Sequence, residues 1–204
     1  MCTKASITES QPVYWSYSHA DKSALSELNK AREQFGELIK RSSEPDLIVV
    51  SKETVFWIEA KLNASNNTRP GDPSNVKKYL SGGGGWFQKV FSSPYQSVAI
   101  DAKRYELTRL WLLGSWMAAD MGRSFVLIDL TKQGREEHSF QSHIVQNHQR
   151  SFLSWTWEEL YQAIKAIFTN DDGRPIRLLW YLENKSVGYD GRGRLIPAFS
   201  TLAK

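Results

Sequence analysis

Three charged residues in one short stretch of the chain have the chemical types needed for metal-dependent hydrolysis. Asp46 follows Pro45, and further along Glu59 and Lys61 flank Ala60. Two carboxylates, together with a backbone carbonyl and water molecules, are ligands that suit Mg²⁺. A neighbouring lysine can orient or deprotonate a metal-bound water and can offset the charge that develops on a phosphate. These residue types therefore indicate cleavage of a phosphodiester bond.

A β-hairpin is predicted to position these residues. The runs 47–50 and 54–58 are rich in β-branched and aromatic residues, and a short polar break separates them. Both runs are almost continuously apolar, so we expect both faces of the hairpin to be covered. Because side chains alternate along a strand, Glu59 and Lys61 should point to the same face. Antiparallel pairing would bring Asp46, at the far end of the first strand, close to both.

The combination of Pro45-Asp46 with Glu59-Ala60-Lys61 resembles the signature of the PD-(D/E)XK nuclease superfamily. The resemblance implies that Asp46 and Glu59 bind Mg²⁺ or Mn²⁺ and that the carbonyl of Ala60 assists them. It also implies that Lys61 acts on the attacking water. The expected activity is that of an endonuclease with DNA as its substrate.

The same resemblance implies an α/β, restriction-endonuclease-like fold. Its core is a central mixed β-sheet flanked by helices, in the order helix, three strands, helix, strand (αβββαβ). On this interpretation residues 1–204 form a single domain, with the core at about 22–130 and a helical and hairpin extension at 131–204.

Other interpretations of the same residues stay open. In an ordinary hairpin, Asp46 would begin a turn and Glu59 and Lys61 would form a solvated pair. A catalytically idle nucleic-acid-binding subunit of a larger assembly, or a nuclease directed at RNA, would also fit. A plain interaction protein with a coincidental motif would bind neither Mg²⁺ nor Mn²⁺.

Upstream of the hairpin, apolar spacing predicts a helix over 22–34 that Gly36 ends. A strand is expected at 37–41. Glu27 lies at the border of the apolar face of this helix, and the resemblance makes it a further metal ligand. The alternative is that Glu27 is a surface acid beside the apolar stripe.

Basic residues downstream are candidates for contacts with nucleic acid. The segment 63–85 is rich in Gly, Asn, Ser and Pro and is expected to be a mobile loop, in which Lys77 and Lys78 could contact phosphates. A long helix is predicted over 97–121, and the resemblance makes Arg104 the first residue there to test. The alternative for Arg104 is a solvated helix face.

The remaining elements are expected as follows. The run 124–130 should be a buried strand parallel to a neighbour, with Asp129 as a residue of the turn at its end. A helix should begin at Trp157, a strand should cover 176–182, and a hairpin should follow around 189–199. The tryptophans, including Trp155, Trp157 and Trp180, are expected to serve core packing.

Composition bounds the function without deciding it. With 26 Lys+Arg against 22 Asp+Glu among 204 residues, the net charge of +4 permits nucleic-acid binding without requiring it. The single cysteine, Cys2, excludes an internal disulfide and a zinc set. No membrane span or signal peptide is visible, so we expect a cytoplasmic protein with no membrane partner. Cleavage of both strands would suggest a homodimer, because one metal site per chain addresses one strand at a time. A partner protein is a candidate source of sequence specificity.

Overall fold

The computed structural model describes residues 10–14, 17–18, 23–37, 44–62, 64–72, 76–167, 173–185, 187–189 and 195–197. The chain divides into two compact units. The first consists of Met1–Glu59, Asn66–Ile128 and Glu137–Leu153, and the second of Ala60–Ser65, Asp129–Glu136 and Ser154–Lys204. Each unit is described separately.

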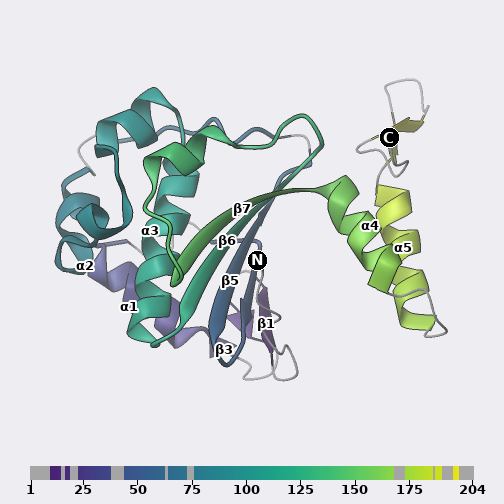
Figure 1. Ribbon diagram of the computed structural model, residues 1–204, viewed down its shortest axis with the longest axis horizontal. Helices are drawn as coiled ribbons and strands as arrows, with labels where there is room; N and C mark the ends of the chain where they lie inside the picture. The colour runs from purple at the N-terminus through teal and green to yellow at the C-terminus, as the bar shows by residue number, and fades with distance from the viewer. Residues whose placement is uncertain are drawn as a thin grey trace. The chain divides into compact units, whose positions relative to one another are not determined.

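A mixed β-sheet is the centre of the first unit (Figure 1). Its strand order is β3-β2-β1-β4-β5-β6-β7. The five longer strands are β1 (Gln11–Tyr14), β4 (Leu47–Val50), β5 (Thr54–Ala60), β6 (Ser124–Thr131) and β7 (Arg150–Thr156), and the short ones are β2 (Tyr17–Ser18) and β3 (Ser23–Ala24). The last residues of β5, β6 and β7 are counted with the second unit.

The sheet contains both antiparallel and parallel pairs of strands. β1 pairs antiparallel with β4, and β4 pairs antiparallel with β5. In contrast, the Ser124 N–H donates to the Glu53 carbonyl at the start of β5, and the Lys61 N–H donates to the Leu130 carbonyl at its end. Since matching ends of β5 and β6 meet, these two strands run parallel.

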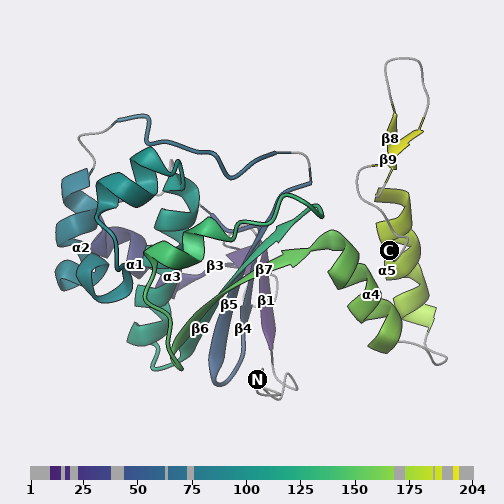
Figure 2. The same ribbon diagram turned by 45° about the horizontal axis from the view of Figure 1, so that its top comes forward.

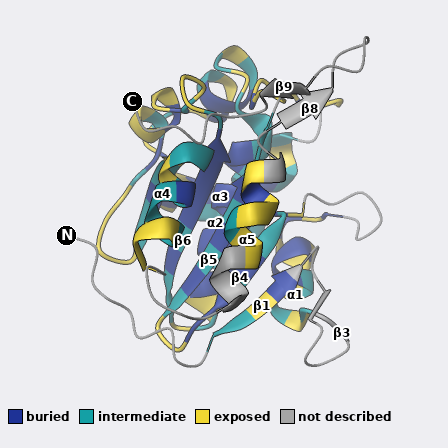
Figure 3. Cartoon of the chain, turned by 90° about the vertical axis from the view of Figure 1, so that its right-hand side faces the viewer, coloured by how far each residue is buried: buried dark blue, intermediate teal, exposed yellow. Residues whose placement is uncertain are grey.

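Helices cover one face of the sheet (Figures 1 and 2). They are α1 (Ser26–Gln34), α2 (Val76–Val90), the π-helix η3 (Gln96–Asp101) and α3 (Tyr105–Asp120), and a short 3-10 helix, η4 (Ser139–His143), follows β6. Trp57 of β5 packs edge-on against Phe125 of β6 at 5.9 Å between ring centroids, and Trp111 of α3 lies 5.6 Å from Phe125. Burial is accordingly concentrated on the central strands (Figure 3).

The second unit has its own small core. Its elements after β7 are α4 (Trp157–Ile167), α5 (Gly173–Lys185), β8 (Val187–Tyr189) and β9 (Leu195–Pro197), and β8 and β9 pair antiparallel. Tyr161 and Leu182 are buried at the centre of this core. A capping box begins α4: Thr156 Oγ1 accepts from the Glu159 N–H at 3.1 Å, and Glu159 Oε2 accepts from the Thr156 N–H at 2.8 Å.

The structure confirms an α/β fold in which a mixed sheet packs against helices, with the hairpin and the buried parallel strand where they were predicted. The predicted order of three strands after the first helix is not observed in the described residues. Glu37 lies outside any strand, and residues 38–43 lie outside the described part. On the other side of β4 from β5, the antiparallel neighbour is β1, which precedes α1 in the chain. No helix in the described residues has the length and apolarity needed to cross a bilayer.

Several predicted elements have different bounds or types. The first helix begins at Ser26, four residues later than predicted, because Ser23–Ala24 is a strand of the sheet. Val76–Ser81 is helical within the segment expected to be a loop. The long helix predicted over 97–121 is split, because Lys103 has φ of 58° between η3 and α3.

Three further predictions are wrong. The strand predicted over 176–182 is part of α5, in which Leu179 and Leu182 have helical spacing and pack into the core of the second unit. Asp129 is not in a turn, because it is fully buried inside β6. Trp155 and Trp180 are exposed and therefore do not serve core packing.

Candidate functional site

The hairpin β4–β5 carries two of the predicted site residues. Its turn is closed locally: the Ser51 N–H donates to the Thr54 carbonyl at 2.9 Å, and the Thr54 N–H donates to Ser51 Oγ at 3.1 Å. These bonds fix the register of the strands, so that Ile48 lies opposite Trp57 and Leu47 opposite Ile58.

This register places the two predicted carboxylates opposite each other. The paired positions end at Leu47 and Ile58, and continuing the same register by one residue would set Asp46 opposite Glu59. Glu59 lies on the same face of the sheet as the buried Trp57, two residues before it, and an extended chain at Asp46 would place Asp46 on that face with Ile48. Directly opposite residues in an antiparallel pair have Cβ atoms about 5 Å apart. The predicted meeting of the two acids is thus consistent with the backbone.

Glu59 and Asp46 differ in their exposure to solvent. Glu59 is the sixth residue of β5 and is buried, with 4% of its surface exposed. Asp46 lies in a bend immediately before β4 and is half-buried. A ligand approaching this pair would therefore meet Asp46 first.

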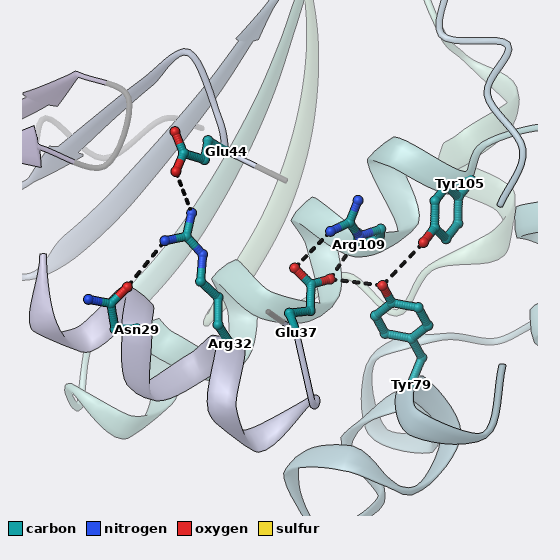
Figure 4. Close-up of polar contacts among 7 residues, drawn as sticks. All are labelled: Asn29, Arg32, Glu37, Glu44, Tyr79, Tyr105 and Arg109. Atoms are coloured by element: carbon teal, nitrogen blue, oxygen red, sulfur yellow. Dashed lines mark hydrogen bonds and ion pairs between the residues drawn. The ribbon is translucent and has the colours of Figure 1, made fainter. Parts of the chain in front are cut away.

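The chain that leads into Asp46 is anchored to α1 through a pair of residues that the sequence analysis did not single out. Arg32 of α1 is almost fully buried and donates to Glu44 Oε1 at 3.0 Å (Figure 4). Its Nη1 also donates to Asn29 Oδ1 at 3.2 Å. Pro45, between Glu44 and Asp46, is buried. These contacts restrain the backbone on the N-terminal side of Asp46.

Lys61 and Ala60 belong to the second unit, and both backbone polar groups of Lys61 form hydrogen bonds there. The Lys61 N–H donates to the Leu130 carbonyl at 2.8 Å, and the Lys61 carbonyl accepts from Trp157 Nε1 at 3.1 Å. The peptide between Ala60 and Lys61 is trans, so the Ala60 carbonyl points away from the Lys61 N–H and hence away from β6. Both side chains are half-buried.

Glu27 lies in the first turn of α1, where its carboxylate accepts a 2.9 Å hydrogen bond from Ser26 Oγ. It is half-buried, as expected for a residue at the border of the apolar face. The described residues contain no group of three or more His, Cys, Asp or Glu side chains able to hold a metal ion. Glu27 therefore does not complete a three-acid cluster with Asp46 and Glu59.

Arg104 immediately precedes α3, and its guanidinium is engaged by the protein itself. It forms an ion pair with Glu137, in which both side chains are largely buried, and it donates to Asn67 Oδ1. Nearby, Thr68 Oγ1 accepts from the Glu106 N–H at 2.8 Å, which satisfies a free donor at the start of α3. These contacts tie the segment around Thr68 to the helix, so they give Arg104 a structural role.

Lys77 and Lys78 lie in the first turn of α2. Lys77 is exposed, and the Nζ of the half-buried Lys78 lies 5.0 Å from the centroid of the Tyr79 ring. The structure thus leaves the charge of Lys77 accessible, whereas Lys78 has an aromatic partner.

A buried polar network around Glu37 was not anticipated from the sequence (Figure 4). Arg109 donates to both carboxylate oxygens of Glu37 at 2.8 and 2.7 Å. Tyr79 also donates to Glu37 at 2.8 Å, and its hydroxyl lies 3.2 Å from that of Tyr105. The network joins the end of α1 to α2 and α3. Only contacts among distant helices reveal it, so no local signal could have identified it.

This environment shifts the pKa values of Tyr79 and Arg109. Burial and the Glu37 carboxylate raise the pKa of Tyr79 above its ordinary value, so the phenol stays neutral. Burial lowers the pKa of Arg109, but the hydrogen bonds and the charge of Glu37 outweigh that effect and raise it overall. Arg109 is therefore positively charged, and the network is an ion pair enclosed by aromatic rings.

Comparisons of the chain with protein-family models, with curated proteins and with solved structures find no match.

Proposed function

We propose that the chain is a metal-dependent nuclease of the restriction-endonuclease-like class that hydrolyses phosphodiester bonds, with DNA as its substrate. The observation that supports this proposal most directly is the register of β4 and β5, whose continuation by one residue would set Asp46 opposite Glu59. Lys61, the second residue after Glu59, completes the set of residue types that such hydrolysis needs.

The donor set fits a hard divalent cation. Glu59 on β5 and Asp46 immediately before β4 would supply two carboxylates, and Mg²⁺ accepts one or two carboxylates while keeping several waters. When bound, Mg²⁺ or Mn²⁺ would supply Lewis acidity toward a phosphate oxygen and a lowered pKa for a bound water. The carbonyl of Ala60 is a further oxygen at the end of the same strand.

The chain's own residues would divide the remaining work. Asp46 and Glu59 carry the negative charge that attracts the cation, and the Arg32–Glu44 pair restrains the segment before Asp46. Lys61 would hold its amine near the attacked phosphate, where its charge offsets the charge that develops during reaction. Lys77, which is exposed on α2, is a candidate for contact with the nucleic-acid backbone.

The test compares the wild type with Asp46→Asn, Glu59→Gln and Lys61→Ala. Supercoiled plasmid, linear duplex, single-stranded DNA and RNA are incubated with Mg²⁺, Mn²⁺ or a chelator. Glu33→Gln and Lys165→Ala serve as matched controls, because both residues are exposed on other helices. We expect metal-dependent cutting of DNA that falls by at least about a hundred-fold in each site variant and is unchanged in the controls.

A metal-binding readout separates chemistry from folding. Mg²⁺ should raise the melting temperature of the wild type, because a ligand that binds only the folded state stabilises it. This rise should be absent in Asp46→Asn and Glu59→Gln and present in Lys61→Ala. Undiminished cutting by the site variants would refute the assignment of these residues.

One observation favours a second candidate, an idle nucleic-acid-binding subunit. The described residues offer two facing acids rather than a cluster of three or more metal-binding side chains. Binding of DNA or RNA without cutting in any metal, together with no Mg²⁺-dependent stabilisation, would support this candidate. Cutting of RNA alone would keep the chemistry and change the substrate.

A further inference from the structure

A second candidate site lies at the opposite end of the strands from Glu59. A cavity of about 490 Å³ opens where β5, β6 and β7 begin, beside the C-terminal half of α3. Its lining includes Lys52, Glu53, Trp86, Ser115, Arg123 and Arg150. Glu53 precedes β5 and Glu59 is near its end, so the two places are about 20 Å apart along the strand. All of these residues belong to the first unit.

The cavity has an excess of positive charge. Lys52, Arg123 and Arg150 form no ion pair with any residue that the structure describes. By contrast, Lys30, Arg32, Arg104 and Arg109 each have a carboxylate partner. The only carboxylate of the cavity lining is the exposed Glu53, so the charge of the lining is not balanced.

Arg150 has an unsatisfied hydrogen-bond donor at this cavity, which an anion could satisfy. Its Nε is shielded from solvent and has no hydrogen-bond partner in the described residues. Its guanidinium carbon lies 5.8 Å from the centroid of the Trp86 ring, and burial lowers the pKa of the guanidinium. A buried N–H without an acceptor is destabilising, and an anion at this position would supply the acceptor and balance the charge of the lining.

Trp86 lines the cavity, and a hydrogen bond restrains its side chain. Its Nε1 donates to Ser115 Oγ at 3.0 Å, and Lys89 Nζ lies 5.1 Å from the centroid of its ring. Since two cations already lie close to this ring, we do not assign it to stacking on a base. The remaining recognition elements are the guanidinium groups and the lysine.

We propose that this cavity binds a phosphate group, held by Arg123 and Arg150 with Lys52 adding charge. A guanidinium pairs with phosphate oxygens through two parallel hydrogen bonds, and two such groups match the charge of a phosphate dianion. The volume exceeds that of the phosphate alone, so the phosphate would be carried by a larger ligand. This proposal does not depend on catalysis by Asp46, Glu59 or Lys61.

The experiment is calorimetric titration of the full chain at low ionic strength with three probes. They are inorganic phosphate, a dinucleotide with a 5′-phosphate, and the same dinucleotide without it. We expect inorganic phosphate to bind to the wild type and to raise its melting temperature. A preference for the 5′-phosphorylated dinucleotide would identify a phosphomonoester as the group recognised, whereas equal binding of both would identify the phosphodiester.

Arg150→Gln and Arg123→Gln should each weaken binding at least ten-fold. Arg69→Gln is the matched control, because Arg69 is exposed and lies outside the cavity lining, and its affinity should equal that of the wild type. Circular dichroism checks that the variants are folded. If Arg150→Gln does not fold, Arg123→Gln and Lys52→Gln carry the test. Absence of binding by all three probes, or unchanged affinity in the folded variants, would overturn the proposal.

Discussion

Glu37 neutralises a guanidinium that would otherwise be isolated between helices. The side chain of Glu37 is 1% exposed and that of Arg109 is 13% exposed, and two parallel hydrogen bonds join them. Removal of one partner leaves the other charge buried and unpaired, which is more costly than loss of the pair itself. A surface ion pair behaves differently, because water replaces the missing partner.

We therefore expect Glu37→Gln to lower the free energy of unfolding by about 3 kcal/mol. The matched control is Asp120→Asn, which breaks the exposed Lys30–Asp120 pair and should cost less than about 1 kcal/mol. Urea unfolding followed by circular dichroism measures both changes. If the two variants lose equal free energy of unfolding, the buried Glu37–Arg109 pair is no more important for stability than the exposed pair.

Because of Tyr79, we expect the free energy of unfolding to decrease at alkaline pH. Its pKa is raised in the folded chain, chiefly by burial and then by Glu37, whereas an unfolded tyrosine ionises near pH 10. The unfolded state therefore loses a proton first, so the contribution of Tyr79 is complete below about pH 10 and decreases as pH rises further.

In Tyr79→Phe this alkaline loss should be smaller than in the wild type. The limiting slope for one such group is about 1.4 kcal/mol per pH unit. At pH 8 the variant should be less stable by about 1 kcal/mol, because the hydrogen bond to Glu37 is lost. Urea unfolding at pH 8 and pH 11 provides the comparison, and identical pH dependence in the two proteins would count against this role for Tyr79.

At the scale of elements, the four glycines of α2 form a turn inside the helical segment. Gly83 and Gly84 have φ of 57° and 67°, which L side chains rarely adopt. They differ in their surroundings. A Cβ on Gly83 would lie 2.7 Å from Trp116 Cδ1 and 2.8 Å from Phe35 Cζ, whereas a Cβ on Gly84 would meet nothing within 4 Å.

Alanine at these two positions separates backbone strain from packing. Gly84→Ala should cost about 1 kcal/mol from positive φ alone. Gly83→Ala should cost a further 1–3 kcal/mol or so, because the added methyl group must displace two rings of the core. Thermal and urea unfolding measure the difference between the two variants. Equal destabilisation would mean that Trp116 and Phe35 can move to accept the methyl group without loss of stability.

At the scale of the whole molecule, the described chain has two hydrophobic cores that coincide with its two compact units. Trp57, Trp111 and Phe125 belong to the larger core, and Tyr161 and Leu182 to the smaller. None of the residues described for the larger core lies beyond Phe152. The stability of the sheet and of the helices that cover it thus rests on residues before α4.

A chain that ends at Thr156 should therefore remain folded. It loses α4 to β9 and the bond from Trp157 to the Lys61 carbonyl, but it keeps the aromatic cluster around Phe125. We expect cooperative urea unfolding with a smaller dependence on denaturant, because less surface is exposed on unfolding. The near-ultraviolet circular dichroism of the cluster should persist. A broad transition without that signal would show that the second unit is needed for the first to fold.

Local pattern in the sequence was sufficient for the hairpin, for β6 and for the helix that begins at Trp157. The alternation of buried side chains along a strand and the capping box of a helix both depend on residues that are close together in the sequence, so local sequence can predict them. The register of Leu47 opposite Ile58, from which the position of Asp46 is inferred, also follows from local information, since a closed turn and a two-residue period fix it. The nuclease function itself stays a prediction.

Only tertiary structure decided the remaining features. The pairing of β1 with β4, the addition of β7 and the helical state of 176–182 depend on partners distant in the chain. The same holds for the Glu37–Arg109 pair and for the cavity around Arg150. A charged residue has the same local sequence pattern whether it faces water or a buried partner. Its role is therefore set by which distant groups the fold brings within hydrogen-bonding distance.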